Sequence, residues 1–250
     1  MQLKWNNRIF IIGTSRTGKS YLRDWIIGRY IRNNNRRYYC IIDDRLDNVM
    51  DLKNKYGFKI IEVNKDNINK NINFKKIMQT YEKVAFITTN VLQSELKSWL
   101  NKISYTMWDL GDGLLVIDEA WAYLKRGKHD PEEFKRVVRG GAKQGLDTIV
   151  VTHRIQDIDP DLIALFNIFI SFRIDEPNSI DKVVNYFDQF NNPDKSLIDN
   201  TVKNKSKRKL NQLVNSYSKP EQIIKNLPNY HFLYADRVNS IQEITSSLGI

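Results

Sequence analysis

The sequence predicts an α/β fold in which a mostly parallel central sheet is covered by helices on both faces. Short apolar runs alternate with amphipathic helical patterns along the chain, and residues 114–117 are apolar at every position. Alternation of strands and helices is typical of parallel sheets. A strand that is apolar throughout suits the middle of such a sheet, where both of its faces are buried.

The apolar runs predict strands at 8–12, 38–42, 59–63, 84–88, 114–117, 148–151 and 168–174, with 231–235 as the last core strand. Helical periodicity covers residues 19–32, where Leu22, Trp25, Ile26 and Tyr30 form one stripe, and it recurs at 94–108 and 131–138. Residues 64–73 are rich in Asn and Lys, and we expect an exposed loop there.

The 250 residues are 41% hydrophobic, which is enough to bury one sizeable core. We expect a single domain over residues 1–250 with a basic insertion at 200–218. Residues 1–7 lack the apolar run of a signal peptide, and no segment approaches the ~20 apolar residues of a membrane span. The single cysteine, Cys40, lies in an apolar run, so we expect a buried, inert thiol in an intracellular protein.

The formal net charge of +10 favours a polyanionic partner, either nucleic acid or an acidic membrane surface. A lysine-rich solvated surface is the alternative, because charge runs are often only soluble surface. The densest basic cluster consists of Lys203, Lys205, Lys207, Arg208 and Lys209.

Residues 13–20 match the phosphate-binding pattern G-x-x-x-x-G-K-[ST] at every fixed position. They are Gly13, Thr14, Ser15, Arg16, Thr17, Gly18, Lys19 and Ser20. A predicted strand enters this loop and a predicted helix leaves it, which disfavours a turn that binds nothing. Backbone N–H groups and the helix N-terminus suit phosphate, Lys19 can reach the β- and γ-phosphates, and the Ser20 hydroxyl can bind Mg²⁺. Tyr21, next on the helix, completes the expected ATP-binding residues.

Two carboxylates, Asp118 and Glu119, follow the apolar strand at 114–117. In an open α/β sheet the carboxyl ends of the strands are where ligands bind. Asp118 can hold Mg²⁺, which usually binds one or two carboxylates together with substrate phosphates. Glu119 can act as the general base on an attacking water. An acidic pair can also begin a helix, and the phosphate-binding loop is what favours the catalytic interpretation.

A third polar group ends the predicted strand at 148–151, where Thr152 and His153 follow the apolar residues. If this strand neighbours the one that carries Asp118, His153 can sense a γ-phosphate. A surface histidine at a strand end is the alternative.

These motifs, in this order, resemble the FtsK–HerA superfamily of DNA-pumping ATPases, which are P-loop NTPases with a RecA-like fold. In that superfamily the sensor strand ends in Thr-Gln-Arg after a glycine-containing helix end; here Gly145 precedes the strand and Thr152-His153-Arg154 ends it. The sequence is most similar to the genome-packaging ATPases of icosahedral archaeal viruses with internal membranes. Further matches to these lie at residues 41–44, 176–178 and 230–233.

The resemblance implies an ATP-driven translocase of double-stranded DNA that packages a viral genome into a preformed capsid. It also implies a homo-oligomeric ring, a pentamer or hexamer, in which an arginine from the neighbouring subunit completes each ATP site. Capsid or membrane-vesicle vertex proteins are expected partners, and the cytoplasm of the infected cell or the virion is the expected location. The alternatives are a cellular or plasmid motor of the same superfamily and an assembly ATPase of the phage-morphogenesis type.

The neighbour's arginine is an open point, because the position where the family usually has it is Ala142. Arg139 and Arg173 are the candidates, with Arg154 as a third choice. For each of them the alternative is a surface salt bridge, worth ~0–1 kcal/mol.

Overall fold

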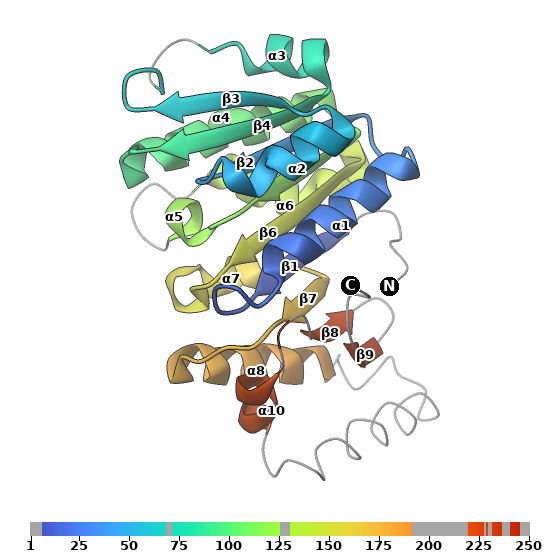
Figure 1. Ribbon diagram of the computed structural model, residues 1–250, viewed down its shortest axis with the longest axis vertical. Helices are drawn as coiled ribbons and strands as arrows, with labels where there is room; N and C mark the ends of the chain where they lie inside the picture. Colours follow the sequence, from blue (N-terminus) through green and yellow to red (C-terminus); the bar gives the residue numbers. More distant parts are fainter. Residues whose placement is uncertain are drawn as a thin grey trace.

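A computed structural model describes residues 7–68, 72–125, 131–191, 220–227, 229, 232–236 and 241–245. Its strands form one nine-stranded sheet in the order β3-β4-β2-β5-β6-β1-β7-β8-β9 (Figure 1). The pairs from β3 to β7 are parallel, whereas β8 and β9 add antiparallel strands beyond β7. The predicted mostly parallel sheet is therefore confirmed.

The strands are β1 (Arg8–Ile12), β2 (Tyr38–Asp43), β3 (Lys59–Asn64), β4 (Lys83–Thr89), β5 (Gly113–Ile117), β6 (Leu146–Thr152), β7 (Ile168–Ser171), β8 (Phe232–Asp236) and β9 (Ile241–Thr245). The α-helices are α1 (Lys19–Arg32), α2 (Asp47–Tyr56), α3 (Phe74–Tyr81), α4 (Gln93–Leu110), α5 (Trp121–Leu124), α6 (Glu132–Gly140), α7 (Pro160–Ile163), α8 (Pro177–Asn191) and α10 (Pro220–Asn226). Two short 3₁₀ helices, η1 (Gly141–Gln144) and η2 (Ile155–Asp157), flank β6.

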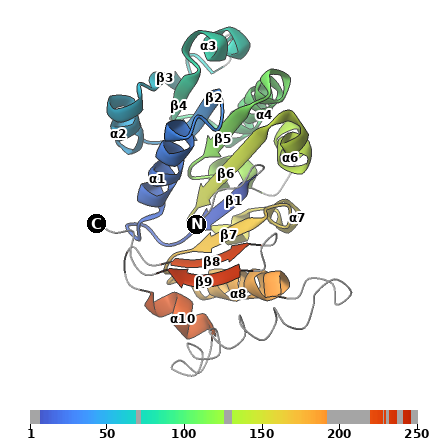
Figure 2. The same cartoon turned by 90° about the vertical axis from the view of Figure 1, so that its right-hand side faces the viewer.

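Helices cover both faces of the sheet, with α1 and α2 on one face and α4 and α6 on the other (Figure 2). Because successive strand residues point to opposite faces, each central strand contributes to two cores. In β1, Ile9 and Ile11 pack with α1 and α2, and Phe10 and Ile12 pack on the opposite side. Burial on both faces explains why these strands are apolar throughout.

Every strand predicted from the apolar runs forms, with small differences at the ends. Strand β7 stops at Ser171, short of the predicted end at residue 174. The predicted strand at 231–235 forms as β8 and contributes Phe232, Tyr234 and Ala235 to the core, and β9, which was not predicted, pairs antiparallel with it. Helices α2, α3, α5, α7, α8 and α10 were not predicted.

Two expectations about local burial have different outcomes. Cys40 is a free, buried thiol, and burial raises its pKa above the ordinary range, as expected for an inert cysteine. The stretch at 64–73 is only partly an exposed loop, because Ile68 within it is buried in the core.

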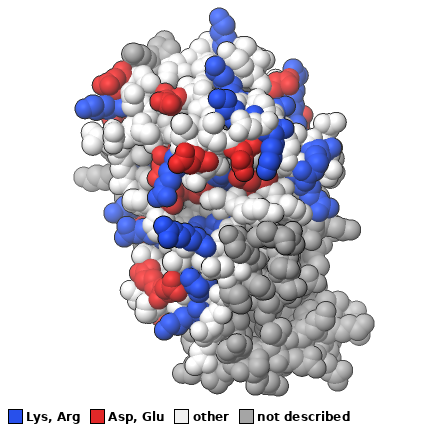
Figure 3. Space-filling model, viewed as in Figure 1, with Lys and Arg blue, Asp and Glu red and all other residues white. Residues whose placement is uncertain are grey.

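Among the described residues on the face drawn in Figure 3, Lys and Arg side chains are interspersed with Asp and Glu and form no continuous basic stripe. The expected basic insertion at 200–218, with its lysine cluster, lies outside the described residues. Within the part of the chain that the structure describes, no helix is long and apolar enough to cross a membrane.

Candidate nucleotide-binding site

The loop at residues 13–20 connects the central strand β1 to α1. Gly18 has φ 112°, a conformation that favours glycine, and Arg16 is also left-handed at φ 63°. The Thr17 hydroxyl donates to Thr14 O at 2.7 Å, and Lys19 Nζ donates to the same carbonyl at 2.8 Å. The loop is thereby curled with the Lys19 ammonium over it.

The segment that follows the neighbouring strand β7 fixes the start of this loop. Thr14 N donates to Arg173 O at 2.8 Å, and Asp175 N donates to Thr14 Oγ1 at 3.2 Å. A side chain on Gly13 would place its Cβ 2.5 Å from the Cβ of Phe172, so only glycine fits there. The first glycine of the pattern therefore serves a close approach between β1 and the segment that follows β7.

The acidic pair follows β5 at the same edge of the sheet. Asp118 N donates to Ile42 O at 2.8 Å and Ala120 N donates to Val151 O at 2.9 Å, which ties the turn to both neighbouring strands. Glu119 between them has φ 46°, an uncommon value for a residue with a side chain. Such backbone strain persists only where the surroundings impose it, and it is common at functional sites.

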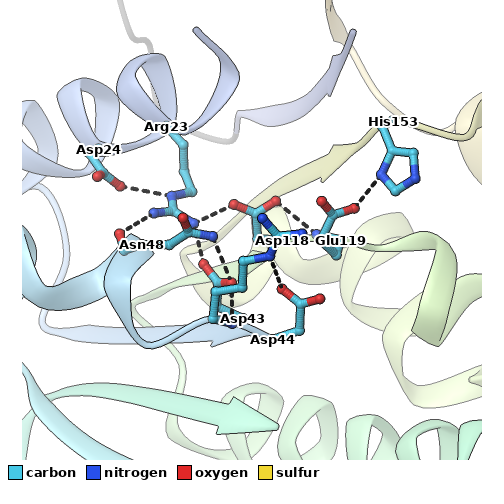
Figure 4. A network of polar contacts seen from close by, with 9 residues as sticks. Arg23, Asp24, Asp43, Asp44, Asn48, Asp118, Glu119 and His153 are labelled. Atoms are coloured by element: carbon cyan, nitrogen blue, oxygen red, sulfur yellow. Dashed lines mark hydrogen bonds and ion pairs between the residues drawn. The ribbon is translucent and has the colours of Figure 1, made fainter. Parts of the chain in front are cut away.

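Glu119 and His153 face each other across the ends of β5 and β6 (Figure 4). His153 Nδ1 lies 2.6 Å from Glu119 Oε2, and the Trp121 indole N–H donates to the same oxygen at 3.2 Å. The His153 and Trp121 rings meet edge to face with centroids 5.8 Å apart. The predicted base and the predicted sensor are therefore in direct contact, and Trp121 orients the base as well.

Behind this pair lies a buried ionic cluster centred on Arg23 of α1 (Figure 4). Its guanidinium donates to Asp24 Oδ1 at 2.8 Å, to Asp43 Oδ2 at 2.6 Å, to Asn48 O at 2.8 Å and to Asp118 Oδ2. The Arg23 side chain is 0% exposed. The cluster joins α1, the end of β2, the start of α2 and the end of β5.

Burial and neighbouring charges change the acid–base properties of this edge. Burial raises the pKa of Asp118 to about 7; the Arg23 charge opposes this rise and the Asp43 charge adds to it. Burial lowers the pKa of Lys19, while the charges of Glu119 and Asp118 act in the opposite direction. Lys19 and both carboxylates are therefore close enough to interact electrostatically.

Comparison with known proteins identifies the fold. No protein-family model and no curated protein sequence matches the chain. Among solved structures it is similar to the genome packaging NTPase of Sulfolobus turreted icosahedral virus 2 in complex with AMP. That match has a TM-score of 0.65 at 16% identity and covers 98% of this chain and 100% of that one.

It is also similar to VirB4 of Thermoanaerobacter pseudethanolicus, with a TM-score of 0.60 at 10% identity, covering 97% of this chain and 90% of that one. A third match is EccC (ATPases 2 and 3) of Thermomonospora curvata, with a TM-score of 0.52 at 11% identity, covering 97% of this chain and 37% of that one. The chain has a P-loop NTPase fold. We call residues 13–20 the P-loop, because they match the phosphate-binding pattern and join β1 to α1, and the sheet edge described above, which we call the ligand edge, is where open α/β sheets bind ligands.

The three candidate arginines lie in different places around the P-loop NTPase fold. Arg173 adjoins this chain's own P-loop, and its Nε lies 3.5 Å from Asp175 Oδ1. Arg154 Nε lies 3.0 Å from Asp157 Oδ2, and its guanidinium lies over the Trp121 ring. Arg139 is exposed on the last turn of α6, which leads to the amino end of β6 and so away from the ligand edge.

The residues at the ligand edge are suited to bind Mg²⁺ together with the phosphates of a nucleotide. Among the described residues, no three His, Cys, Asp or Glu side chains are grouped so as to hold a metal ion by themselves. Magnesium needs no such group, because it usually takes one or two carboxylates and completes its shell with phosphate oxygens and water. The Ser20 hydroxyl on the first turn of α1 and the Asp118 carboxylate are the groups that would hold it.

Sequence reasoning missed Arg23 and Trp121. A signal for Arg23 existed, because it shares a helical face with Ile26, Ile27 and Tyr30, all of which are buried. A charged residue on a buried helical stripe needs a partner of opposite charge. The nearest unassigned carboxylate at a strand end was Asp43.

Proposed function

We propose that this chain hydrolyses ATP, with Glu119 as the general base. The observation that carries the proposal is the meeting of Lys19, Asp118, Glu119 and His153 at one edge of the sheet, directly beyond the P-loop. The loop supplies donors for phosphate, and a carboxylate positioned by two other side chains supplies a proton acceptor.

In this mechanism the backbone N–H groups of residues 13–18 and the Lys19 ammonium bind the phosphates and stabilise the charge that develops on them. Bound Mg²⁺ would neutralise part of the charge on the β- and γ-phosphate oxygens. Glu119 accepts a proton from the attacking water at its carboxylate. His153 and Trp121, both in contact with Oε2, hold that carboxylate in position.

We further propose that hydrolysis drives movement of double-stranded DNA, as in packaging of a viral genome. The net charge of +10 supports a polyanionic partner. The similarity of fold to a viral genome packaging NTPase over 98% of this chain supports the viral setting. The same proposal includes capsid or membrane-vesicle vertex proteins as partners. It places the protein in the cytoplasm of the infected cell or in the virion.

A ring of identical subunits is the oligomer that suits such a motor, because head-to-tail interfaces close into rings. We propose that a neighbour's arginine completes each site and raises the rate by ~10³–10⁵. Arg139 is exposed and distant from its own P-loop, which suits a role in the neighbour's site, whereas Arg173 adjoins its own loop. Mixing Lys19→Ala chains with Arg139→Ala chains should restore activity if the site is shared, and Arg173→Ala and Arg154→Ala chains serve as comparisons.

The test of the motor is ATP turnover by the full chain with and without duplex DNA, combined with displacement of a third strand from a DNA triplex. Stimulation by DNA and ATP-dependent displacement are expected. Glu119→Gln should bind ATP and give neither activity. Turnover that ignores DNA would instead support the assembly ATPase.

The basic cluster at residues 203–209 is the proposed DNA contact, through phosphates and not through bases, because a motor must hold any sequence. Replacing its Lys and Arg residues by Ser or Gln should flatten the dependence of log K on log salt by up to ~0.9 per lost contact. An unchanged slope would assign the cluster to solvated surface.

A cellular or plasmid motor is the second candidate, favoured by the similarity to VirB4 at a TM-score of 0.60. The genes beside this one distinguish the two. A neighbouring double jelly-roll capsid gene supports packaging, and conjugation genes support the plasmid motor.

A further inference from the structure

Arg23 is a buried cation that has no part in the mechanism proposed above. It follows Ser20 by three positions on α1, so both side chains lie on one side of the helix. The side chain is fully buried, yet it reaches the carboxylate proposed to bind Mg²⁺ (Figure 4). One helix therefore carries both the P-loop hydroxyl and the group that contacts Asp118.

The hydrogen bonds of the two aspartates on Arg23 Nη1 differ. Asp43 Oδ1 accepts from Arg45 N at 3.0 Å and from Asn48 Nδ2 at 3.1 Å, while Oδ2 accepts from Arg23. Asp118 Oδ1 accepts from Glu119 N at 2.8 Å, and Oδ2 accepts from Arg23. Since each carboxylate oxygen has two lone pairs, Asp118 keeps acceptor capacity on both oxygens, whereas Asp43 is largely committed to the protein.

Arginine has the chemistry that this position requires. Its planar guanidinium stays charged and presents donors in fixed directions, so it can separate two buried carboxylates while holding both. Without it, Asp43 and Asp118 would face each other across a buried space, and like charges there repel strongly. Asp24 accepts from Nε and Asn48 O accepts from Nη2, which fixes the guanidinium itself.

We propose that Arg23 is a positioning residue that holds Asp118 in the orientation needed to bind Mg²⁺ together with ATP. The inference rests on the proposed nucleotide function. It predicts that Arg23 affects the contribution of Mg²⁺ to nucleotide binding and leaves binding of the nucleotide without metal unchanged.

A purely structural role makes a different prediction. A buried arginine that only stabilises the fold would alter the free energy of unfolding and leave the metal dependence of binding intact. Arg36 is the matched control, because it is also buried and pairs with an aspartate, Asp147, at 2.9 Å. It lies before β2, at the amino end of the strands and away from the P-loop.

The experiment measures the affinity of the full chain for a fluorescent ATP analogue in excess Mg²⁺ and in EDTA, and takes the ratio of the two. In Arg23→Met the ratio should fall about tenfold or more, the range seen when partners of metal ligands are removed. Affinity in EDTA should stay close to that of the wild type. Arg23→Lys should restore part of the ratio, because lysine keeps the positive charge but lacks the planar set of donors that the guanidinium has. Arg36→Met should keep the wild-type ratio.

A wild-type ratio in folded Arg23→Met would overturn the inference, as would an equal loss of affinity with and without metal. If Arg23→Met does not fold, the double variant Arg23→Met/Asp43→Asn takes its place, because it also removes one of the two repelling charges. Its ratio of affinities in Mg²⁺ and in EDTA is then compared with that of the wild type. Failure of the proposed nucleotide function is distinguishable, because the wild-type chain itself would then bind no analogue in either buffer.

Discussion

Two buried arginine clusters lie at opposite ends of the strands and differ in charge balance. At the carboxyl ends, Arg23 contacts the three carboxylates of Asp24, Asp43 and Asp118. At the amino ends, Arg36 pairs with the buried Asp147 at 2.9 Å and lies 3.8 Å from the exposed Asp112. The first cluster has three carboxylates for one arginine, whereas the buried pair of the second, Arg36 and Asp147, has one carboxylate for one arginine.

This difference supports the proposed ligand site at the Arg23 cluster and a purely structural role for the Arg36 cluster. Asp147 is satisfied inside the protein, since Asn7 N and Arg36 both donate to it, and the cluster thereby ties the segment before β1 to β6. Excess buried negative charge is costly unless a cation compensates it. The Arg23 cluster, beside the P-loop, therefore suits a metal ion that arrives with the nucleotide, while the Arg36 cluster needs no ligand.

The largest effect is expected at the ligand edge and in chemistry alone. Glu119→Gln keeps the shape of the side chain but removes the proton acceptor, so steady-state ATP turnover should fall by ~10²–10⁴. The midpoint of urea unfolding should stay at the wild-type value. A variant with wild-type turnover would show that another group is the base.

At the amino ends of the strands, where Arg36 lies, a substitution should affect stability alone. Arg36→Met leaves Asp147 as an unpaired buried charge, which should lower the free energy of unfolding by ~3–5 kcal/mol. Urea unfolding measures this, and affinity for ATP in the folded variant should not change. A loss of ATP affinity as large as the loss of stability would mean that the two edges are coupled.

The buried Asp147 should also make the stability of the protein depend on pH. Burial raises the pKa of Asp147 to about 6, and Arg36 opposes the rise. The folded state therefore holds this proton more tightly than the unfolded state, whose pKa is about 3.9. Stability contributed by Asp147 is present below about pH 4 and is lost as the pH rises through about 6, by at most ~3 kcal/mol.

Asp147→Asn removes this titration. The difference in unfolding free energy between wild type and variant should therefore change between about pH 4 and 6 and stay constant above that window. Parallel curves across the window would contradict the assignment of the pKa to Asp147.

The smallest effect is expected from a neutral contact next to the Arg23 cluster. The Tyr123 hydroxyl lies 2.5 Å from Thr88 Oγ1, which is also 3.4 Å from Asp43 O. Tyr123→Phe should lower the free energy of unfolding by ~1 kcal/mol, the usual contribution of one hydrogen bond. The Mg²⁺ dependence of nucleotide binding should be unchanged; a change would extend the metal-sensitive region to Tyr123.

Much of the site could be predicted because its residues are adjacent in sequence or end predicted strands. Lys19 and Ser20 follow from the spacing of the P-loop pattern, and Asp118, Glu119 and His153 follow from their positions after β5 and β6. Parallel strands bring their carboxyl ends together, so the contact between Glu119 and His153 follows from topology alone. Their roles in catalysis stay predictions.

Arg23 could not be assigned in this way, because its partners depend on how α1 packs on the sheet. Asp43 and Asp118 lie 20 and 95 residues away along the chain. Helix α2 was missed for a related reason: it buries only Val49 and Leu52, so its apolar periodicity is weak. Strand β9 was missed because β8 was taken to end the sheet.

The strand order has a consequence for synthesis of the protein on the ribosome. Strand β1 emerges early but pairs with β6 and β7, so Arg8 meets its partner Thr148 only after 140 further residues. Until then β1 has no neighbour and the loop after it lacks its anchor at Arg173. Contacts so distant along the chain form late. The motif near the start of the chain is therefore among the last parts to become functional, and nucleotide cannot assist the folding of the nascent chain before β7 is made.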